Sequence, residues 1–192
     1  MSLNETPRGE RLHVAIFGRR NVGKSRLINA LTGQDVSIVS EVKGTTTDPV
    51  SKAMELLPLG PVVIIDTPGL DDDGALGALR VQRTRDVLHR TDVALLVTDA
   101  EGGFGACERE FSAAVRGKKL PWAVVVNKAD LAAPSEAARR EIAAQAQVPV
   151  HVVSAATGAG VEDLKLALAR IVPEADAKFR IVGDLLRPAD VV

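Results

Sequence analysis

One glycine-rich stretch, residues 18–25, constrains the fold of this chain more than any other. Its sequence, Gly-Arg-Arg-Asn-Val-Gly-Lys-Ser, matches the pattern G-x-x-x-x-G-K-S/T. An apolar run at residues 12–17 precedes it, and residues 24–31 carry apolar side chains at helical spacing. A strand, a loop of this kind and a helix together form a phosphate-binding loop. The stretch therefore predicts an α/β protein that binds a phosphorylated ligand, and a glycine-rich turn with a chance lysine is the weaker alternative.

Each part of this loop has an expected role. The glycines let the backbone curl so that successive N–H groups face phosphate oxygens, and the following helix adds its positive N-terminal end. We expect the Lys24 ammonium to reach the β- and γ-phosphates and to act in catalysis, and the Ser25 hydroxyl to ligate Mg²⁺. The predicted nucleotide-binding residues of the loop are Asn21, Val22, Gly23, Lys24, Ser25 and Arg26.

Apolar runs of strand length alternate with helical patterns along the rest of the chain. They predict a doubly wound, mostly parallel sheet of six strands with one antiparallel edge strand, from a hairpin at residues 51–66. Ligands of such sheets bind at the carboxyl ends of the strands. The expected strands are residues 12–17, 52–57, 62–65, 93–98, 122–126 and 148–153, and the expected helices are residues 24–31, 76–90, 108–116, 136–146 and 161–172.

Composition sets limits on compartment and chemistry. The net charge of −1 gives no electrostatic argument for a nucleic-acid partner. No apolar run approaches the ~20 residues of a membrane span, and the polar N-terminus lacks the apolar core of a signal peptide, so we expect a cytoplasmic protein. Cys107 is the only cysteine, so neither an internal disulfide nor a cysteine-ligated iron–sulfur cluster can form within this chain alone.

The alternating pattern also predicts the domain boundaries. We expect one domain at residues 11–172 after a flexible N-terminus at residues 1–10. The tail, residues 173–192, does not continue the alternation and ends in an apolar stretch. We interpret it as a linker and the start of a further domain that is cut off.

A second signal, Asp66-Thr67-Pro68-Gly69, follows the strand predicted at residues 62–65. A carboxylate at that place can hold Mg²⁺ through a water molecule, and Gly69 allows a backbone N–H to approach the γ-phosphate closely. The preceding loop, residues 34–50, contains three adjacent threonines. A threonine hydroxyl there can complete the Mg²⁺ shell, whereas the alternative is a β-rich run leading into an edge strand.

A third signal, Asn127-Lys128-Ala129-Asp130, follows the strand at residues 122–126. The Asp130 carboxylate can accept hydrogen bonds from N1–H and the exocyclic amine of guanine, and adenine lacks this donor pair. Lys128 can lie along the base, and Asn127 can tie the base to the loop. A backbone N–H of a later turn can meet the guanine O6. That turn contains Ser154, Ala155 and Ala156.

Leu70, directly after Gly69, departs from the expected catalytic pattern. A general template for nucleotide hydrolysis places a water-orienting glutamine at this position. Leucine cannot polarise water, so either hydrolysis is slow or another element or ion supplies the missing function.

Together these motifs resemble a GTP-binding G domain of the P-loop NTPase fold, over about residues 11–172. The resemblance is strongest to the branch that contains the tRNA-modification, ribosome-assembly and hydrogenase-maturation GTPases, and it rests on Asn21, residues 44–46 and Leu70. It implies a GTPase that uses GTP, GDP and Mg²⁺, with Thr46 as a catalytic Mg²⁺ ligand beside Ser25 and Asp66. The matching asparagine accompanies potassium-stimulated hydrolysis in some members, so Asn21 is a candidate K⁺ ligand and, alternatively, a loop hydrogen-bonder.

Three stretches, residues 42–50, 54–61 and 182–192, are similar to the FeFe-hydrogenase maturation GTPase family. In that family a G domain precedes a dimerisation domain and an iron–sulfur domain, and the protein is a scaffold and carrier for the di-iron precursor. The resemblance implies hydrogenase-maturation proteins and apo-hydrogenase as partners, and a homodimer formed through the further domain. Cluster-binding cysteines are absent here, so the resemblance extends only to the GTPase module.

Three functions compete on these grounds. The first is the regulatory GTPase domain of a hydrogenase-maturation scaffold, whose loops at residues 34–50 and 67–80 respond to the γ-phosphate. The second is a ribosome-assembly or tRNA-modification GTPase, which requires a basic RNA-binding module that the sequence does not display, so we expect no nucleic-acid partner. The third, a metabolic P-loop kinase, leaves Asp130 unexplained. The first is the preferred prediction.

Overall fold

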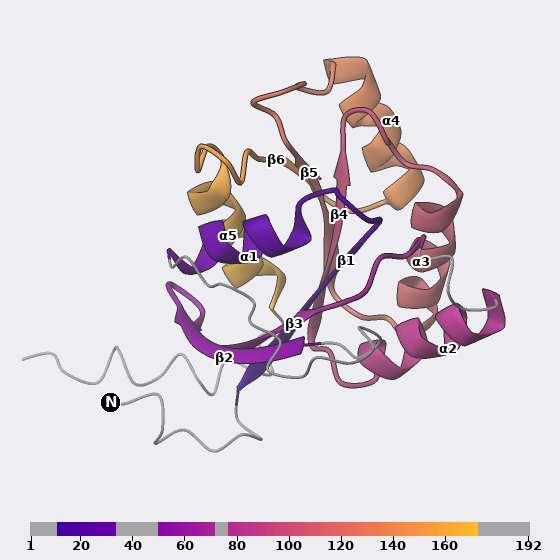
Figure 1. The fold of residues 1–192 in the computed structure, drawn as a ribbon, viewed down its shortest axis with the longest axis vertical. Coiled ribbons are helices and arrows are strands. Elements are labelled where there is room, and N and C mark those ends of the chain that lie inside the picture. Colours follow the sequence, from indigo (N-terminus) through magenta and orange to yellow (C-terminus); the bar gives the residue numbers. More distant parts are fainter. Residues whose placement is uncertain (1–10, 34–49, 72–76, 173–192) are drawn as a thin grey trace, which may run out of the picture.

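The computed structural model describes residues 11–33, 50–71 and 77–172. In these residues a six-stranded sheet lies between two layers of helices (Figure 1), with the strand order β2-β3-β1-β4-β5-β6. The edge strand β2 (Val50–Leu56) is antiparallel to β3 (Gly60–Asp66), and all other neighbouring strands are parallel. The predicted fold is confirmed. The N-terminal and C-terminal segments predicted at residues 1–10 and 173–192 lie outside the described residues.

The remaining elements follow the predicted alternation closely. Two boundaries differ from the prediction for a local reason. The sixth strand starts at Val150, because Pro149 has no N–H to donate to a ladder. The third helix starts at Ala106, because the Glu108 carboxylate accepts a hydrogen bond from the Gly105 backbone N–H at 2.9 Å and completes the first turn. The strands are β1 (Leu12–Gly18), β4 (Val93–Asp99), β5 (Trp122–Asn127) and β6 (Val150–Val152), and the helices are α1 (Lys24–Thr32), α2 (Gly77–Leu88), α3 (Ala106–Gly117), α4 (Glu136–Ala146) and α5 (Val161–Ile171).

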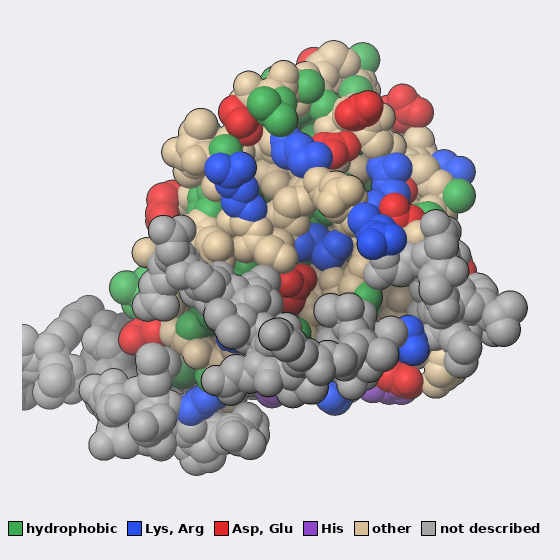
Figure 2. All heavy atoms as spheres, in the orientation of Figure 1, with side chains coloured by type: hydrophobic (Ala, Val, Ile, Leu, Met, Phe, Trp, Pro, Cys, Tyr) green, Lys and Arg blue, Asp and Glu red, His purple; other side chains and the backbone are tan. Residues whose placement is uncertain are grey.

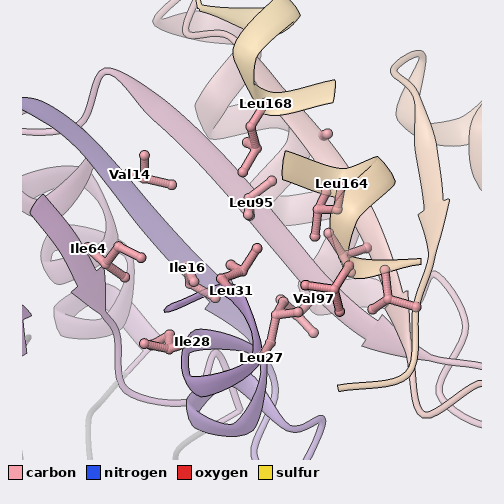
Figure 3. Packing of buried hydrophobic residues seen from close by; sticks show 14 of the residues in the cluster. Val14, Ile16, Leu27, Ile28, Leu31, Ile64, Leu95, Val97, Leu164 and Leu168 are labelled. Atoms are coloured by element: carbon pink, nitrogen blue, oxygen red, sulfur yellow. The ribbon is translucent and has the colours of Figure 1, made fainter. Parts of the chain in front are cut away.

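The central strands are buried on both faces. Val14 and Ile16 of β1 pack into one apolar cluster with α1 and α5, as Figure 3 shows for part of that cluster. Ala15 and Phe17 face the opposite cluster, under α2, α3 and α4. Phe111 of α3 packs there against Phe17 at a centroid distance of 4.7 Å, with the two rings tilted by 43°. Alternate residues of one strand thus anchor both helical layers, as period-two side-chain geometry requires.

This architecture collects the loops of interest at one edge. From β1 the chain passes to β3 on one side and later to β4 on the other, so the end of β1 lies where the strand order reverses. In open α/β sheets, ligands bind at this switch point, outside the carboxyl ends of the strands. Within the described residues, no helix combines the length and apolarity needed to cross a membrane.

Candidate functional site

The loop after β1 is shaped by backbone conformations that few residues adopt. Gly23 has a φ of 89°, and a Cβ at this position would lie 2.5 Å from the Asn127 amide nitrogen. Asn21 has a φ of 61° and its side chain is exposed. Asparagine is one of the few non-glycine residues that tolerates left-handed backbone, so this conformation alone gives a reason for Asn21. The left-handed backbone at Asn21 and Gly23 produces the tight curl that a phosphate-binding loop requires.

Lys24 holds this curl closed. Its ammonium donates hydrogen bonds to the carbonyl oxygens of Gly18, at 3.0 Å, and Arg19, at 2.8 Å. The lysine thereby spans the loop from the first residue of α1 to the last residue of β1. A lysine ammonium in a glycine-rich loop that precedes a helix N-terminus is suited to bind phosphate oxygens.

Ser25 and Asp66, both predicted Mg²⁺ ligands, lie together. The Ser25 hydroxyl donates to Asp66 Oδ2 at 3.1 Å. Asp66 Oδ1 is buried and has no hydrogen-bond partner among the described residues. Burial raises the pKa of Asp66 above its usual value, and the Ser25 hydrogen bond, the charge of Lys24 and the Thr67 backbone N–H offset this only in part. Hard oxygen ligands of this kind are those that Mg²⁺ prefers, so the two residues fit the expected metal. Thr46, the third predicted ligand, lies outside the described residues.

The segment after β3 contacts the phosphate loop directly. The Leu70 backbone N–H donates to the Gly18 carbonyl at 3.1 Å, and the Asp71 carboxylate accepts from the Arg20 backbone N–H at 2.6 Å. A Cβ on Gly69 would lie 2.5 Å from Arg20 Cγ and 3.1 Å from the Arg20 backbone nitrogen, so a larger residue would force this part of the phosphate loop to shift. The Leu70 side chain packs into the cluster under α2, α3 and α4. Position 70 therefore supplies no polar group for orienting water.

The loops after β5 and β6 form the other end of the site. The Asn127 side chain is buried; its amide donates to the Val22 carbonyl at 3.0 Å and accepts from the Ala155 backbone N–H at 3.0 Å. Asn127 thus ties the phosphate loop to the turn at residues 154–156. The Asp130 carboxylate is exposed and accepts a hydrogen bond from the Ser154 hydroxyl at 2.6 Å. Ser154 itself is buried, so it fixes the direction of Asp130.

In the turn predicted to meet the guanine O6, two of the three backbone N–H groups already donate within the protein. The Ser154 backbone N–H donates to the Ala159 carbonyl at 2.9 Å, and the Ala155 N–H is taken by Asn127. Ala156 is exposed. The sequence indicated backbone contacts to the base here, but it gave no signal for the Ser154 hydroxyl as a positioning group for Asp130.

Three further charged residues at this edge were missed by sequence reasoning. Arg19 Nε donates to Glu108 Oε1 at 2.7 Å, and the Glu108 side chain is only 1% exposed. Asp99, at the end of β4, pairs with Lys128 at 2.8 Å. Arg19 occupies a variable position of the phosphate-loop pattern, and no motif marks Asp99 or Glu108, since a single aspartate or glutamate occurs in any loop. Only the fact that Asp99 directly follows an apolar strand hinted at a role.

The family described as 50S ribosome-binding GTPase matches residues 13–128. The chain belongs to this family. The match begins in β1 and ends at Lys128, so it includes the phosphate loop, Asp66, Gly69 and Asn127.

Individual relatives are similar to this chain over most of its length. The tRNA modification GTPase MnmE of Synechococcus sp. (strain JA-3-3Ab) is 37% identical over 162 residues, which is 84% of this chain and 34% of that protein. The structure of an Era variant from Aquifex aeolicus bound to GDP·AlF4⁻ matches with a TM-score of 0.70 and 30% identity, over 84% of this chain and 57% of that chain. Era in complex with MgGDPNP and part of 16S ribosomal RNA matches with a TM-score of 0.68 and 30% identity, over 93% and 60%. The chain thus spans about a third of the length of the MnmE relative.

The two glycines that flank α1 allow a matched test of the phosphate loop. Gly23→Ala places a Cβ against the Asn127 amide on a backbone with φ of 89°, so we expect nucleotide affinity to fall at least tenfold, the size of one lost interaction of about 1.4 kcal/mol. Gly33→Ala meets nothing within 4 Å at a φ of 65°. It should cost about 1 kcal/mol of stability, as left-handed backbone does for alanine, and leave affinity unchanged. Fluorescent-nucleotide titration and urea unfolding measure the two effects, and equal affinities of both variants would contradict the assignment.

Proposed function

We propose that this domain binds GTP and GDP with Mg²⁺ and hydrolyses GTP. The observation that carries the proposal is the arrangement around Asn127. It joins the phosphate loop, through Val22, to the turn that aims the Asp130 carboxylate through Ser154. A phosphate cradle and a carboxylate suited to the guanine edge are thereby held in one unit.

At the phosphate end, the groups of this chain have separable tasks. Lys24 would exchange its carbonyl partners for β- and γ-phosphate oxygens, and the N–H groups of residues 21–26 would surround them. Ser25 and Asp66, with Thr46, would hold Mg²⁺, which when bound neutralises charge on the phosphates. The Gly69 backbone N–H would meet the γ-phosphate, which links residues 67–71 to the state of the nucleotide.

The guanine assignment predicts a specific loss for Asp130→Ala. Two hydrogen bonds to a charged acceptor are each worth about 1.5–3 kcal/mol, so GTP affinity should fall at least a hundredfold while ATP affinity stays weak and unchanged. Asp86→Ala is the control, because Asp86 is exposed on α2 and accepts a hydrogen bond from Gln82 of the same helix. Competition titrations with GTP and ATP measure both. Equal affinities of the wild-type chain for the two nucleotides would overturn the assignment.

We also propose that hydrolysis is slow and is stimulated by K⁺. Leu70 is packed in the apolar cluster, so the site lacks a side chain that orients water at that position. Asn21 lies exposed in the phosphate loop, and its side-chain amide carries an oxygen of the kind that binds a monovalent cation. A cation beside the phosphates would supply positive charge in the way that an arginine finger does.

The potassium proposal is tested by Asn21→Gly. Glycine adopts the φ of 61° without strain, so this variant removes the side chain and preserves the loop. We expect the wild-type domain to hydrolyse GTP several-fold faster in KCl than in NaCl, at well under ~1 s⁻¹, and the variant to bind GTP normally without this difference. Equal wild-type rates in the two salts, or undiminished stimulation in Asn21→Gly, would argue against a cation at this position.

For the protein as a whole, we propose a role with RNA, of the tRNA-modification or ribosome-assembly type. The family description and the names of the MnmE and Era relatives support this role. It replaces hydrogenase maturation as the preferred function, because the proteins compared above bear no such name. Basic and acidic side chains are interspersed on the face shown in Figure 2. The charges visible on this face therefore add no separate support for RNA binding.

Deletion of the gene separates the two roles. We expect an altered profile of modified tRNA nucleosides or of ribosomal subunits, measured by mass spectrometry and sucrose-gradient sedimentation, with unchanged hydrogen-evolving activity. The wild-type gene should restore the profile, whereas Lys24→Ala, which removes the central cation of the phosphate loop, should not. Loss of hydrogen evolution with normal tRNA and ribosomes would instead support the maturation role.

A further inference from the structure

The charged residues missed by the sequence motifs form a connection between the two ends of the nucleotide site. Asp99 ends β4 and is paired in register with Asn127 at the end of β5. Its Oδ2 accepts from the Lys128 ammonium at 2.8 Å, and its Oδ1 accepts from the Gly102 backbone N–H at 2.8 Å. Both oxygens of one carboxylate are thus fixed, one by the loop after β4 and one by the lysine after β5.

The Asp99–Lys128 pair is shielded from solvent on the aspartate side. The Asp99 side chain is 13% exposed and the Lys128 side chain 35% exposed. Burial opposes the ionised form of Asp99, but the hydrogen bonds from Lys128 and Gly102, with the charges of Lys128 and Arg19, hold the pKa of Asp99 below its usual value. The carboxylate is therefore ionised at neutral pH, and the lysine has a fixed anionic partner.

The same loop also holds the phosphate end. A Cβ on Gly102 would overlap the Arg19 guanidinium, so the loop backbone lies directly against this side chain. Arg19 is bound on its other side by buried Glu108 of α3. Lys24 in turn donates to the Arg19 carbonyl at 2.8 Å. Residues 99–108 therefore lie against both the phosphate loop and the lysine of the guanine motif.

We propose that Asp99 is a positioning residue for the nucleotide base, acting through Lys128. In the proposed guanine site, on which this inference rests, the methylene stem of Lys128 lies along the base. Lysine has a long, flexible side chain, so without a partner the Lys128 ammonium samples many positions. The ion pair with Asp99 fixes the ammonium at the level of the sheet edge and leaves the stem in one orientation. The task of Asp99 is to preorganise the base end of the site before the nucleotide binds.

The test compares ligands that share phosphates and differ in the base. Asp99→Asn removes the charge but keeps an oxygen that can accept from Gly102. With the full 192-residue chain, we expect the affinity for fluorescent methylanthraniloyl-GDP to fall about tenfold, the size expected for one charge-assisted hydrogen bond. The affinity for inorganic tripolyphosphate, which has no base, should change less than twofold. Asp86→Asn serves as the matched control, and Asp99→Glu should recover part of the GDP affinity because it restores the charge.

A double-variant cycle shows whether Asp99 acts through Lys128. We expect Lys128→Met to lower GDP affinity about tenfold and Asp99→Asn to add little to it, because the interacting partner is already gone. Additive losses, or an equal loss for tripolyphosphate, would overturn the inference and assign Asp99 a general structural role. Thermal unfolding of each variant sets a temperature at which all are folded. Failure of the wild-type chain to prefer GDP over ADP would refute the guanine site itself, whereas preference retained in full by Asp99→Asn would refute only the role of Asp99.

Discussion

The two hydrogen bonds of the Asn127 side chain are the contacts on which the shape of this site depends. The amide donates to the Val22 carbonyl in the loop after β1 and accepts from the Ala155 N–H in the turn after β6. A carboxamide presents both a donor and an acceptor on a short stem. Aspartate would lose the donor, and leucine both. The amide also fills the space beside Gly23, so that position has no room for a Cβ. The Asn127 side chain therefore explains why a glycine is required at position 23.

The two Asn127 hydrogen bonds can form because the parallel sheet places the three loops side by side. β1, β4, β5 and β6 run in the same direction, so their following loops all leave at one edge. The strands themselves are fixed by apolar packing on both faces, through residues such as Val14 and Phe17. The core thus fixes the strand ends from which the loops start, and polar contacts then set the shape of each loop.

Sequence predicted those parts of the site that are encoded in short, contiguous patterns. The phosphate loop, Asp66 and the motif at residues 127–130 each follow an apolar strand, so their type and position in the sheet were evident. Sequence reasoning missed Arg19, Asp99 and Glu108, because each acts through a partner that is distant in the sequence. Arg19 and Glu108, for example, are 89 residues apart. The start of α3 was placed late for the same reason, since the capping role of Glu108 depends on its buried orientation.

The ion pair of Arg19 and Glu108 shows that a buried charge can serve to place a loop without adding stability to the fold. Removing two charges from water costs several kcal/mol, and an apolar pair of similar volume is often at least as stable. Glu108 is nonetheless completely buried, and its second oxygen accepts the Gly105 N–H. An apolar substitute would keep the core filled but would leave the Arg19 guanidinium without this ion pair. Arg19 belongs to the phosphate loop, where its carbonyl accepts a hydrogen bond from the Lys24 ammonium. The buried charge is therefore better explained by the location it gives to the phosphate loop than by the stability it adds to the fold.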